Sequence, residues 1–190
     1  MTVNQLKPDF IGFVFAPKSK RCVTYEQAAN LKSQLDPEIK AVGVFVNEMP
    51  ETAAALLNSG TIDLAQLHGA EDEDYIQTLR KLTNKPLIRA FRIRNKEDLS
   101  SALSCSADHI LLDAGAGDGL TFDWELLHGF SRPYFLAGGL GPENVRIAIE
   151  KLNPYAVDVS SGIETDGVKD PAKMTAFVNT VRVQQFSGHY

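Results

Sequence analysis

Two segments near the end of the sequence pair small residues in a way that suits phosphate binding. Gly138-Gly139 closes the apolar run PYFLAG (133–138), and Ser161-Gly162 follows the run YAVDVS (155–160). Small residues after a strand expose backbone N–H groups, which bind phosphate together with a helix N-terminus. The alternative is two tight turns that need glycine. Because the pairs follow the last two runs, the sequence favours phosphate binding.

A carboxylate stands at a similar place one run earlier. Asp113 ends the run HILLD (109–113) and precedes the glycine-rich stretch AGAGDG (114–119). A carboxyl group at the end of a strand can act as a general acid or base. The alternative is a loop cap that accepts local backbone N–H groups. We favour acid–base chemistry for Asp113, and we expect Thr121 to cap the helix that follows.

A basic segment and a histidine complete the candidates. Three cations lie within APKSKRC (16–22), where Arg21 offers a planar fork for a carboxylate. A solvated basic loop is the alternative. His68 lies in QLHG (66–69), where the neighbouring glycine would let a ligand approach. A structural histidine is an equally good interpretation of His68.

Seven short apolar runs must position these residues. The runs are rich in Val, Ile and Phe, with apolar residues at both parities, which suits strands covered on both faces as in parallel sheets. They occupy 10–15, 41–46, 62–67, 86–91, 109–113, 133–138 and 155–160. Segments of helical period follow them at 25–35, 50–57, 72–82, 96–103, 122–127, 142–152 and 171–183.

The alternation predicts an α/β fold. Strand–helix pairs that repeat every ~25 residues predict a parallel sheet with right-handed crossovers. An open doubly wound sheet and a (β/α)8 TIM barrel are the two main solutions, and the even spacing favours the barrel. No internal boundary is visible, so we expect a single domain over 1–190. Function is expected at the carboxyl ends of the strands, where the candidate residues stand.

Composition narrows the class of protein. The chain has 190 residues, 44% hydrophobic and 23% charged, which is typical of a globular protein. A net charge of −5 disfavours a general nucleic-acid binder. The N-terminal residues contain no signal-peptide core, no apolar run has membrane-spanning length, and the two cysteines form no CxxC motif. We expect a cytoplasmic protein with no nucleic-acid or membrane partner.

Six segments together resemble one family. They are GFVFAPKSKR, VGVFVNE, QLHG, LLDAG…TFDW, AGGLGPENV and AVDVSSGIE, and in this order they look like phosphoribosylanthranilate isomerase of tryptophan biosynthesis. The resemblance covers essentially residues 8–183. It implies a TIM barrel without metal or organic cofactor. It also implies an Amadori rearrangement of N-(5-phosphoribosyl)anthranilate, a small-molecule substrate, to 1-(2-carboxyphenylamino)-1-deoxyribulose 5-phosphate.

The resemblance implies a role for each candidate residue. Asp113 matches the general acid that protonates the ribose ring oxygen. Arg21 matches the residue that holds the anthranilate carboxylate, and His68 matches a strand-end histidine that lines the site. The phosphate loops are matched by Gly138, Gly139, Ser161 and Gly162.

One segment of the family has no counterpart here. Family members open with a strand ending Lys-(Ile/Val)-Cys-Gly, whose cysteine is the general base, whereas MTVNQLKPDF (1–10) matches only the tail of the first helix. We therefore expect a barrel of seven βα units that lacks the first strand and most of the first helix. Its two unpaired edges could support self-association. Cys22 is expected to be a small buried residue rather than the base, and Cys105 to lie near a helix end.

Three functions stay open from the sequence. The first is the isomerase. The second is a catalytically impaired, phosphate-binding fragment of the same barrel, which would bind ligand without turnover. The third is another phosphate-binding TIM-barrel enzyme, against which the segments LLDAG…TFDW and APKSKR argue.

Overall fold

A computed structural model describes residues 2–114 and 124–187. Its main sheet contains seven strands, hydrogen-bonded in chain order from β1 to β7. The strands are β1 (Phe10–Val14), β2 (Lys40–Phe45), β3 (Leu64–Leu67), β4 (Leu87–Arg92), β5 (His109–Asp113), β6 (Tyr134–Ala137) and β7 (Ala156–Val157). All seven apolar runs predicted to be strands are confirmed. The chain divides into two compact units, each described by itself: 1–90 with 105–110, and 91–104 with 111–190.

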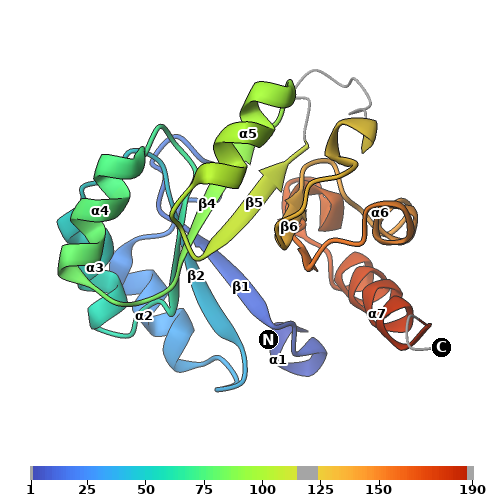
Figure 1. The fold of residues 1–190 in the computed structure, drawn as a ribbon. Helices are drawn as coiled ribbons and strands as arrows, with labels where there is room; N and C mark the ends of the chain where they lie inside the picture. Colours follow the sequence, from blue (N-terminus) through green and yellow to red (C-terminus); the bar gives the residue numbers. More distant parts are fainter. Residues whose placement is uncertain (1, 115–123, 188–190) are drawn as a thin grey trace. The chain divides into compact units, whose positions relative to one another are not determined.

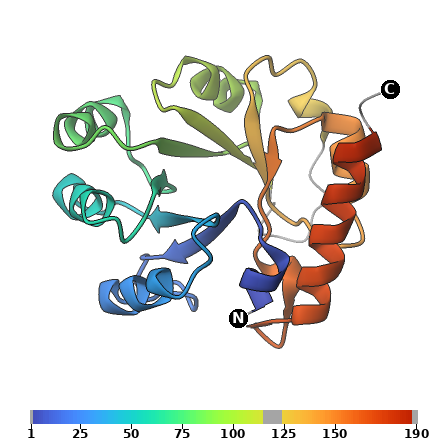
Figure 2. The same cartoon turned by 90° about the horizontal axis from the view of Figure 1, so that it is seen from below.

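The first unit carries β1 to β3 and most of β4. Its strands pair in parallel, with Phe10 opposite Lys40 and Ala65 opposite Leu87. Its helices are α1 (Thr2–Leu6), α2 (Tyr25–Ser33), α3 (Pro50–Asn58) and α4 (Glu73–Leu82). The helices α2, α3 and α4 lie along one side of these strands (Figures 1 and 2). The core of this unit lies along these strands, and the side chain of Phe45 is fully buried.

Local residues explain where these helices begin. Thr24 and Gln27 form a capping box: the Thr24 hydroxyl accepts the Gln27 N–H at 3.1 Å, and the Gln27 side chain accepts the Thr24 N–H at 2.8 Å. Pro50 occupies the first position of α3, as expected for its fixed φ. Asp72 caps α4 by accepting the Tyr75 N–H at 2.9 Å, so this helix begins one residue later than predicted.

Two aspartates fasten the amino ends of strands in the first unit. Asp63, just before β3, accepts the Ala41 N–H of β2 at 2.7 Å and pairs with a lysine of α2. Asp108, just before β5, accepts the Leu87 N–H of β4 at 2.7 Å and pairs with Arg80 of α4. The same arrangement therefore occurs twice, two strands apart. We call Asp63 and Asp108 the amino-end brackets.

The second unit carries the end of β5 together with β6 and β7. Its helices are α5 (Lys96–Ser104), the 3-10 helix η1 (Trp124–Leu127), α6 (Val145–Leu152), the 3-10 helix η2 (Ser161–Ile163) and α7 (Pro171–Ser187). The helix α7 contacts α6 and η2 (Figure 1). β6 and β7 are parallel, with Phe135 opposite Ala156. The side chains of Phe135 and Leu136 are buried.

A short hairpin in this unit was not predicted. The strands β8 (Glu164–Thr165) and β9 (Val168–Lys169) pair antiparallel around Asp166-Gly167. Both turn residues have positive φ, at 52° and 79°. An Asp-Gly pair is a common signal for such a turn, so the sequence did contain evidence for the hairpin.

Three expectations about local structure need correction or lie outside the described residues. Cys22 is exposed, so the expectation that it is buried is wrong; Cys105 is buried just after α5. The predicted helix 142–152 begins only at Val145. The predicted cap Thr121 lies outside the described residues. Among the helices that are described, none has the length and apolar character to cross a membrane.

Candidate functional site

Every candidate residue lies at or after the carboxyl end of a strand. In the first unit, Arg21 lies in the segment after β1, and His68 directly follows β3. In the second unit, Asp113 ends β5, Gly138 and Gly139 follow β6, and Ser161 and Gly162 follow β7. The strand-end placement expected from the sequence is therefore confirmed residue by residue within each unit.

The basic segment folds back onto the end of β1. The Val23 N–H donates to the Val14 carbonyl at 2.9 Å, and the Cys22 N–H donates to the Ser19 carbonyl at 3.1 Å. The Ser19 hydroxyl accepts the Arg21 N–H at 3.1 Å. These bonds fix the backbone beneath Arg21, which is an exposed residue. A guanidinium held at this place can meet a carboxylate with two parallel hydrogen bonds.

His68 has a buried glutamine beside it. The Gln66 Nε2 lies 2.9 Å from the His68 Nδ1, and the His68 N–H donates to the Phe45 carbonyl of β2 at 2.9 Å. Gln66 lies within β3 and is only 6% exposed. His68 itself is half-buried. Nothing in the pattern of this apolar strand indicated that it would supply a polar partner for His68.

A buried arginine holds the backbone around His68. Arg89 of β4 donates to the Leu67 carbonyl at 2.8 Å, to the Gly69 carbonyl at 3.0 Å and to the Ala90 carbonyl at 2.7 Å. Its guanidinium lies 3.8 Å from the carboxylate of Glu71. Burial lowers the pKa of Arg89, and the charge of Glu71 opposes that change.

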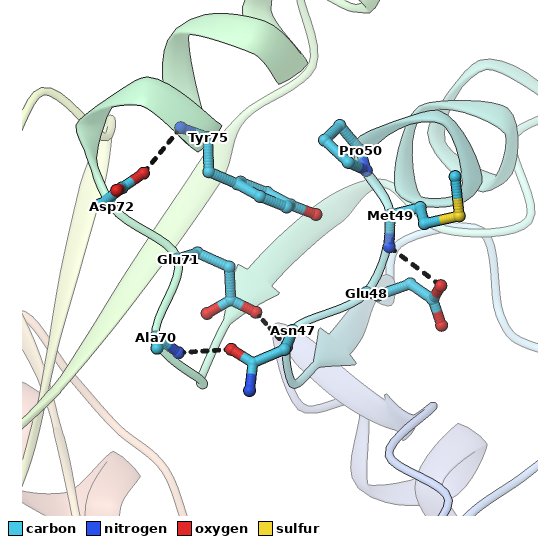
Figure 3. Close-up of a pocket in the computed structure, with 8 residues that line it drawn as sticks. All are labelled: Asn47, Glu48, Met49, Pro50, Ala70, Glu71, Asp72 and Tyr75. Carbon is cyan, nitrogen blue, oxygen red and sulfur yellow. Dashed lines mark hydrogen bonds between the residues drawn. The ribbon is translucent and has the colours of Figure 1, made fainter.

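Glu71 binds the same backbone from the other side. Its two carboxylate oxygens accept the Asn47 N–H at 2.6 Å and the Gly69 N–H at 2.7 Å. Asn47 in turn accepts the Ala70 N–H at 2.6 Å through its side chain (Figure 3). Asn47 has a left-handed backbone with φ 54°, which asparagine tolerates better than most residues. We call Asn47, Glu71 and Arg89 the carboxyl-end clamp; the sequence analysis missed all three.

A hollow of about 350 Å³ lies beside the clamp, between the segments that follow β2 and β3 (Figure 3). Neither Arg21 nor His68 lines it. Its lining residues are Asn47, Glu48, Met49, Pro50, Ala70, Glu71, Asp72 and Tyr75. Burial, with the nearby negative charges of Glu71 and Glu48, raises the pKa of Tyr75. The hollow is thus rich in carboxylates and unsuited to an anion.

In the second unit, Asp113 is half-buried at the end of β5. Its carbonyl accepts the Ile93 N–H at 3.1 Å, and the next residue, Ala114, donates to the Ala137 carbonyl of β6 at 2.8 Å. The backbone at Asp113 is therefore held from two neighbouring segments. The glycine-rich stretch that follows Ala114 lies outside the described residues.

The loop after β6 contains two glycines in a left-handed backbone conformation. Gly138 and Gly139 have φ of 94° and 63°, where side chains are strained. The Asn144 side chain crosses the loop: it donates to the Gly139 carbonyl at 2.9 Å and accepts the Gly141 N–H at 2.8 Å. This crossing occupies the residues expected to open α6, which explains why the helix begins three residues late.

The loop after β7 packs tightly on the loop after β6. A Cβ on Gly162 would lie 1.9 Å from the Leu140 carbonyl oxygen, so only glycine fits there. Close by, Lys169 donates to the Ser160 carbonyl at 2.7 Å and pairs with Glu164 at 2.9 Å. The structure thus brings both predicted phosphate segments together and adds a lysine that the sequence analysis missed. Within the described ranges, no three His, Cys, Asp or Glu side chains gather as metal ligands would.

Comparison with known proteins gives a consistent result. The family model for N-(5'-phosphoribosyl)anthranilate (PRA) isomerase matches residues 2–180. An N-(5'-phosphoribosyl)anthranilate isomerase of Thermoanaerobacter sp. (strain X514) is 48% identical, over 94% of this chain and 90% of the relative.

Solved structures agree with the sequence relatives. The crystal structure of phosphoribosyl anthranilate isomerase from Thermotoga maritima superposes with a TM-score of 0.86 at 36% identity, covering 96% of this chain and 92% of that chain. A crystal structure of the same enzyme type with reduced 1-(o-carboxyphenylamino)-1-deoxyribulose 5-phosphate gives a TM-score of 0.84 at 36% identity, covering 96% and 91%. The chain therefore belongs to the N-(5'-phosphoribosyl)anthranilate isomerase family.

Proposed function

We propose that this chain converts N-(5-phosphoribosyl)anthranilate to 1-(2-carboxyphenylamino)-1-deoxyribulose 5-phosphate in tryptophan biosynthesis. The observation that carries the proposal is the family match over residues 2–180. The solved relative that holds the reduced form of this product supports the same substrate class. Another phosphate-binding barrel enzyme, the third possibility from the sequence, has no comparable support.

Asp113 is the proposed general acid. It gives a proton to the ribose ring oxygen, the ring C–O bond breaks, and the nitrogen lone pair forms the Schiff base. Its place at the end of β5 and its half-buried position support this role. A positioned acid of this kind typically contributes about 10²–10⁴-fold.

Arg21 is the proposed partner of the anthranilate carboxylate. It is exposed, and it stands on a backbone fixed by Ser19. Phosphate is assigned to Gly138, Gly139, Ser161 and Gly162. The support for that assignment is the left-handed backbone of Gly138 and Gly139, which turns the loop after β6, and the close packing of Gly162 against it. Holding both ends of the substrate orients C1 and C2 for proton transfer.

The proton on C2 needs a base. The family motif Lys-(Ile/Val)-Cys-Gly does not occur in this sequence, and exposed Cys22 stands at the start of the segment leading into α2. Two outcomes are therefore distinct for this chain: turnover, or binding of substrate without turnover.

The test is a paired measurement on the 190-residue chain. Consumption of the substrate is followed by the loss of anthranilate fluorescence, and binding of the reduced product is followed by calorimetry. Turnover with binding is the expected result. Binding without turnover would replace the isomerase by a phosphate-binding barrel, and the absence of both would overturn the proposal.

Three further statements from the sequence stay predictions. They are a single domain over 1–190, a cytoplasmic location, and self-association through strand edges. Sedimentation at several protein concentrations tests the last of these, since a mass that does not change with concentration and equals one chain would contradict it.

A further inference from the structure

We propose that Gln66 is a positioning residue that holds His68 with its ring proton on Nε2. The tautomer is a property of the chain alone. Only the last step, what His68 then contacts, rests on the proposed function.

The burial of Gln66 is the first observation. This residue is 6% exposed in a strand whose four residues are all buried, and it stands opposite Val44 and Ile88 in the parallel pairs. A primary amide placed among apolar side chains costs free energy unless it is hydrogen-bonded. An apolar residue would fill this position without that cost, so the amide is expected to serve a partner.

The chemistry of the contact determines the tautomer. The amide nitrogen of Gln66 carries only donors, and it lies 2.9 Å from the His68 Nδ1. A neutral imidazole has one donor nitrogen and one acceptor nitrogen. A neutral ring that accepts from the amide at Nδ1 carries its proton on Nε2, which is the tautomer we propose. A doubly protonated ring would set two donors against each other, so the contact fits the neutral ring.

The carboxyl-end clamp fixes the backbone that carries this ring. Hydrogen bonds hold the Leu67 carbonyl, the His68 N–H, both polar backbone groups of Gly69 and the Ala70 N–H. With the main chain held on both sides of His68, the ring keeps only its side-chain torsions. The amide restrains those torsions by binding Nδ1.

The consequence is an oriented N–H donor at the end of β3. A neutral ring with its proton on Nε2 donates to an oxygen of the substrate, either a sugar hydroxyl or a carboxylate. The opposite tautomer would present a lone pair, which repels a carboxylate oxygen and can only accept a hydrogen bond from a hydroxyl. Gln66 thereby affects ligand binding without contacting the ligand.

Nitrogen-15 NMR of the unliganded, labelled chain tests the tautomer directly. The His68 signals are assigned by their loss in His68→Gln. In the wild type we expect Nδ1 to have the shift of an unprotonated ring nitrogen and Nε2 that of a protonated one. In Gln66→Glu the carboxylate accepts a proton from Nδ1, so Nδ1 should shift to the protonated value. In Gln66→Leu both tautomers should be populated.

The spectrum contains its own controls. His109 and His128 should keep their signals in all variants, and Asp63→Asn, at the amino end of the same strand, should leave His68 unchanged. If Gln66→Glu does not fold, the mixed tautomers expected in Gln66→Leu still test the proposal. A wild type with protonated Nδ1, or a Gln66 variant with wild-type His68 signals, would overturn the proposal.

Affinity for the reduced product tests the functional step. In Gln66→Glu, a ring that keeps one proton carries it on Nδ1, so Nε2 faces the substrate oxygen as an acceptor and binding should weaken by about tenfold or more. The Nε2 shift in the same spectrum shows whether the ring holds one proton or two. Asp63→Asn should bind as the wild type does. If the wild type binds nothing, the proposed function fails while the tautomer result stands. If the Gln66→Glu spectrum shows Nδ1 protonated and Nε2 unprotonated and the variant still binds normally, the role of Gln66 in ligand binding is wrong.

Discussion

In the first unit, the amino ends and the carboxyl ends of the strands are held by different kinds of contact. At the amino ends, the brackets Asp63 and Asp108 make the same pair of contacts twice: one backbone N–H of the neighbouring strand and one cation from a helix. At the carboxyl ends, the clamp occurs once. The clamp needs a left-handed backbone conformation at Asn47 and the carboxylate of Glu71, whose side chain is 1% exposed.

The two kinds of contact hold different parts of the molecule together. The contacts of the amino-end brackets are repeated and half-exposed, so they are suited to joining one βα unit to the next. A single buried network is suited to fixing one segment, here the backbone around His68. In the second unit, Gly138 and Gly139, which have positive φ, and the tightly packed Gly162 also lie after the carboxyl ends of strands. Substitutions at the two ends should therefore have different effects on activity and on unfolding.

The largest expected effect is on activity at a carboxyl end. Asp113→Asn keeps the shape of the side chain but removes its proton-donating power. We expect kcat to fall by about 10²–10⁴-fold with the melting temperature nearly unchanged. Steady-state fluorescence and thermal unfolding measure the two quantities. An Asp113→Asn variant with wild-type kcat would remove Asp113 from the mechanism.

Next in size is the loss of the clamp carboxylate. Glu71→Ala leaves the Arg89 guanidinium buried without its carboxylate and two backbone N–H groups without their acceptor. We expect a loss of about 3 kcal/mol in the free energy of unfolding, and faster hydrogen exchange at the Gly69 amide. Glu38→Ala, at an exposed carboxylate, is the control. Equal stability of the two variants would contradict the clamp.

A smaller effect is expected from crowding the second-unit loops. Gly162→Ala forces Leu140 to move, which should cost about 1–3 kcal/mol and weaken phosphate binding. Gly12→Ala is the matched control, because Gly12, like Gly162, lacks a positive φ, and a Cβ there would make only an ordinary contact of 3.8 Å with Val44. Calorimetric titration with inorganic phosphate compares them. A Gly162→Ala variant that binds phosphate normally would argue against the assignment of this loop.

Arg21 should affect selectivity more than stability. Without its guanidinium, Arg21→Ala should bind anthranilate-bearing ligands about tenfold more weakly and bare phosphosugars as before. Lys18→Ala, in the same basic segment, controls for general charge. Equal loss for both ligand types would exclude carboxylate recognition by Arg21.

The smallest effect belongs to an amino-end bracket and depends on pH. Burial alone would raise the pKa of Asp108, but the Leu87 N–H and Arg80 outweigh it and leave the pKa below its ordinary 3.8. The charged form thus stabilises the fold above that value, and its contribution disappears as pH falls through the lower folded pKa. The melting temperatures of wild type and Asp108→Asn should therefore converge in acid, with activity at neutral pH unchanged. A constant difference down to about pH 2 would refute this.

The features that depend only on burial, above all the positions of the strands, were predicted from the sequence. Strands covered on both faces leave a pattern of apolar runs, and residues at their ends could be identified without coordinates. The clamp could not, because Arg89 looks like an interruption of the run PLIRAF until the register places it beside Gly69. Cys22 was wrongly expected to be buried, since a loop that folds back leaves no periodicity. The Asp166-Gly167 turn and the repeated aspartates did leave signals that were overlooked.

Strand pairing between chain neighbours has a consequence for how the molecule assembles. The paired positions in β1 to β4, and in β6 with β7, lie only about 20 to 30 residues apart in the chain. Closing each of these loops costs little conformational entropy, and the cost is nearly the same for each loop. Short sequence separations between contacting residues favour rapid folding. Each strand–helix–strand segment can then serve as the template on which the next one forms.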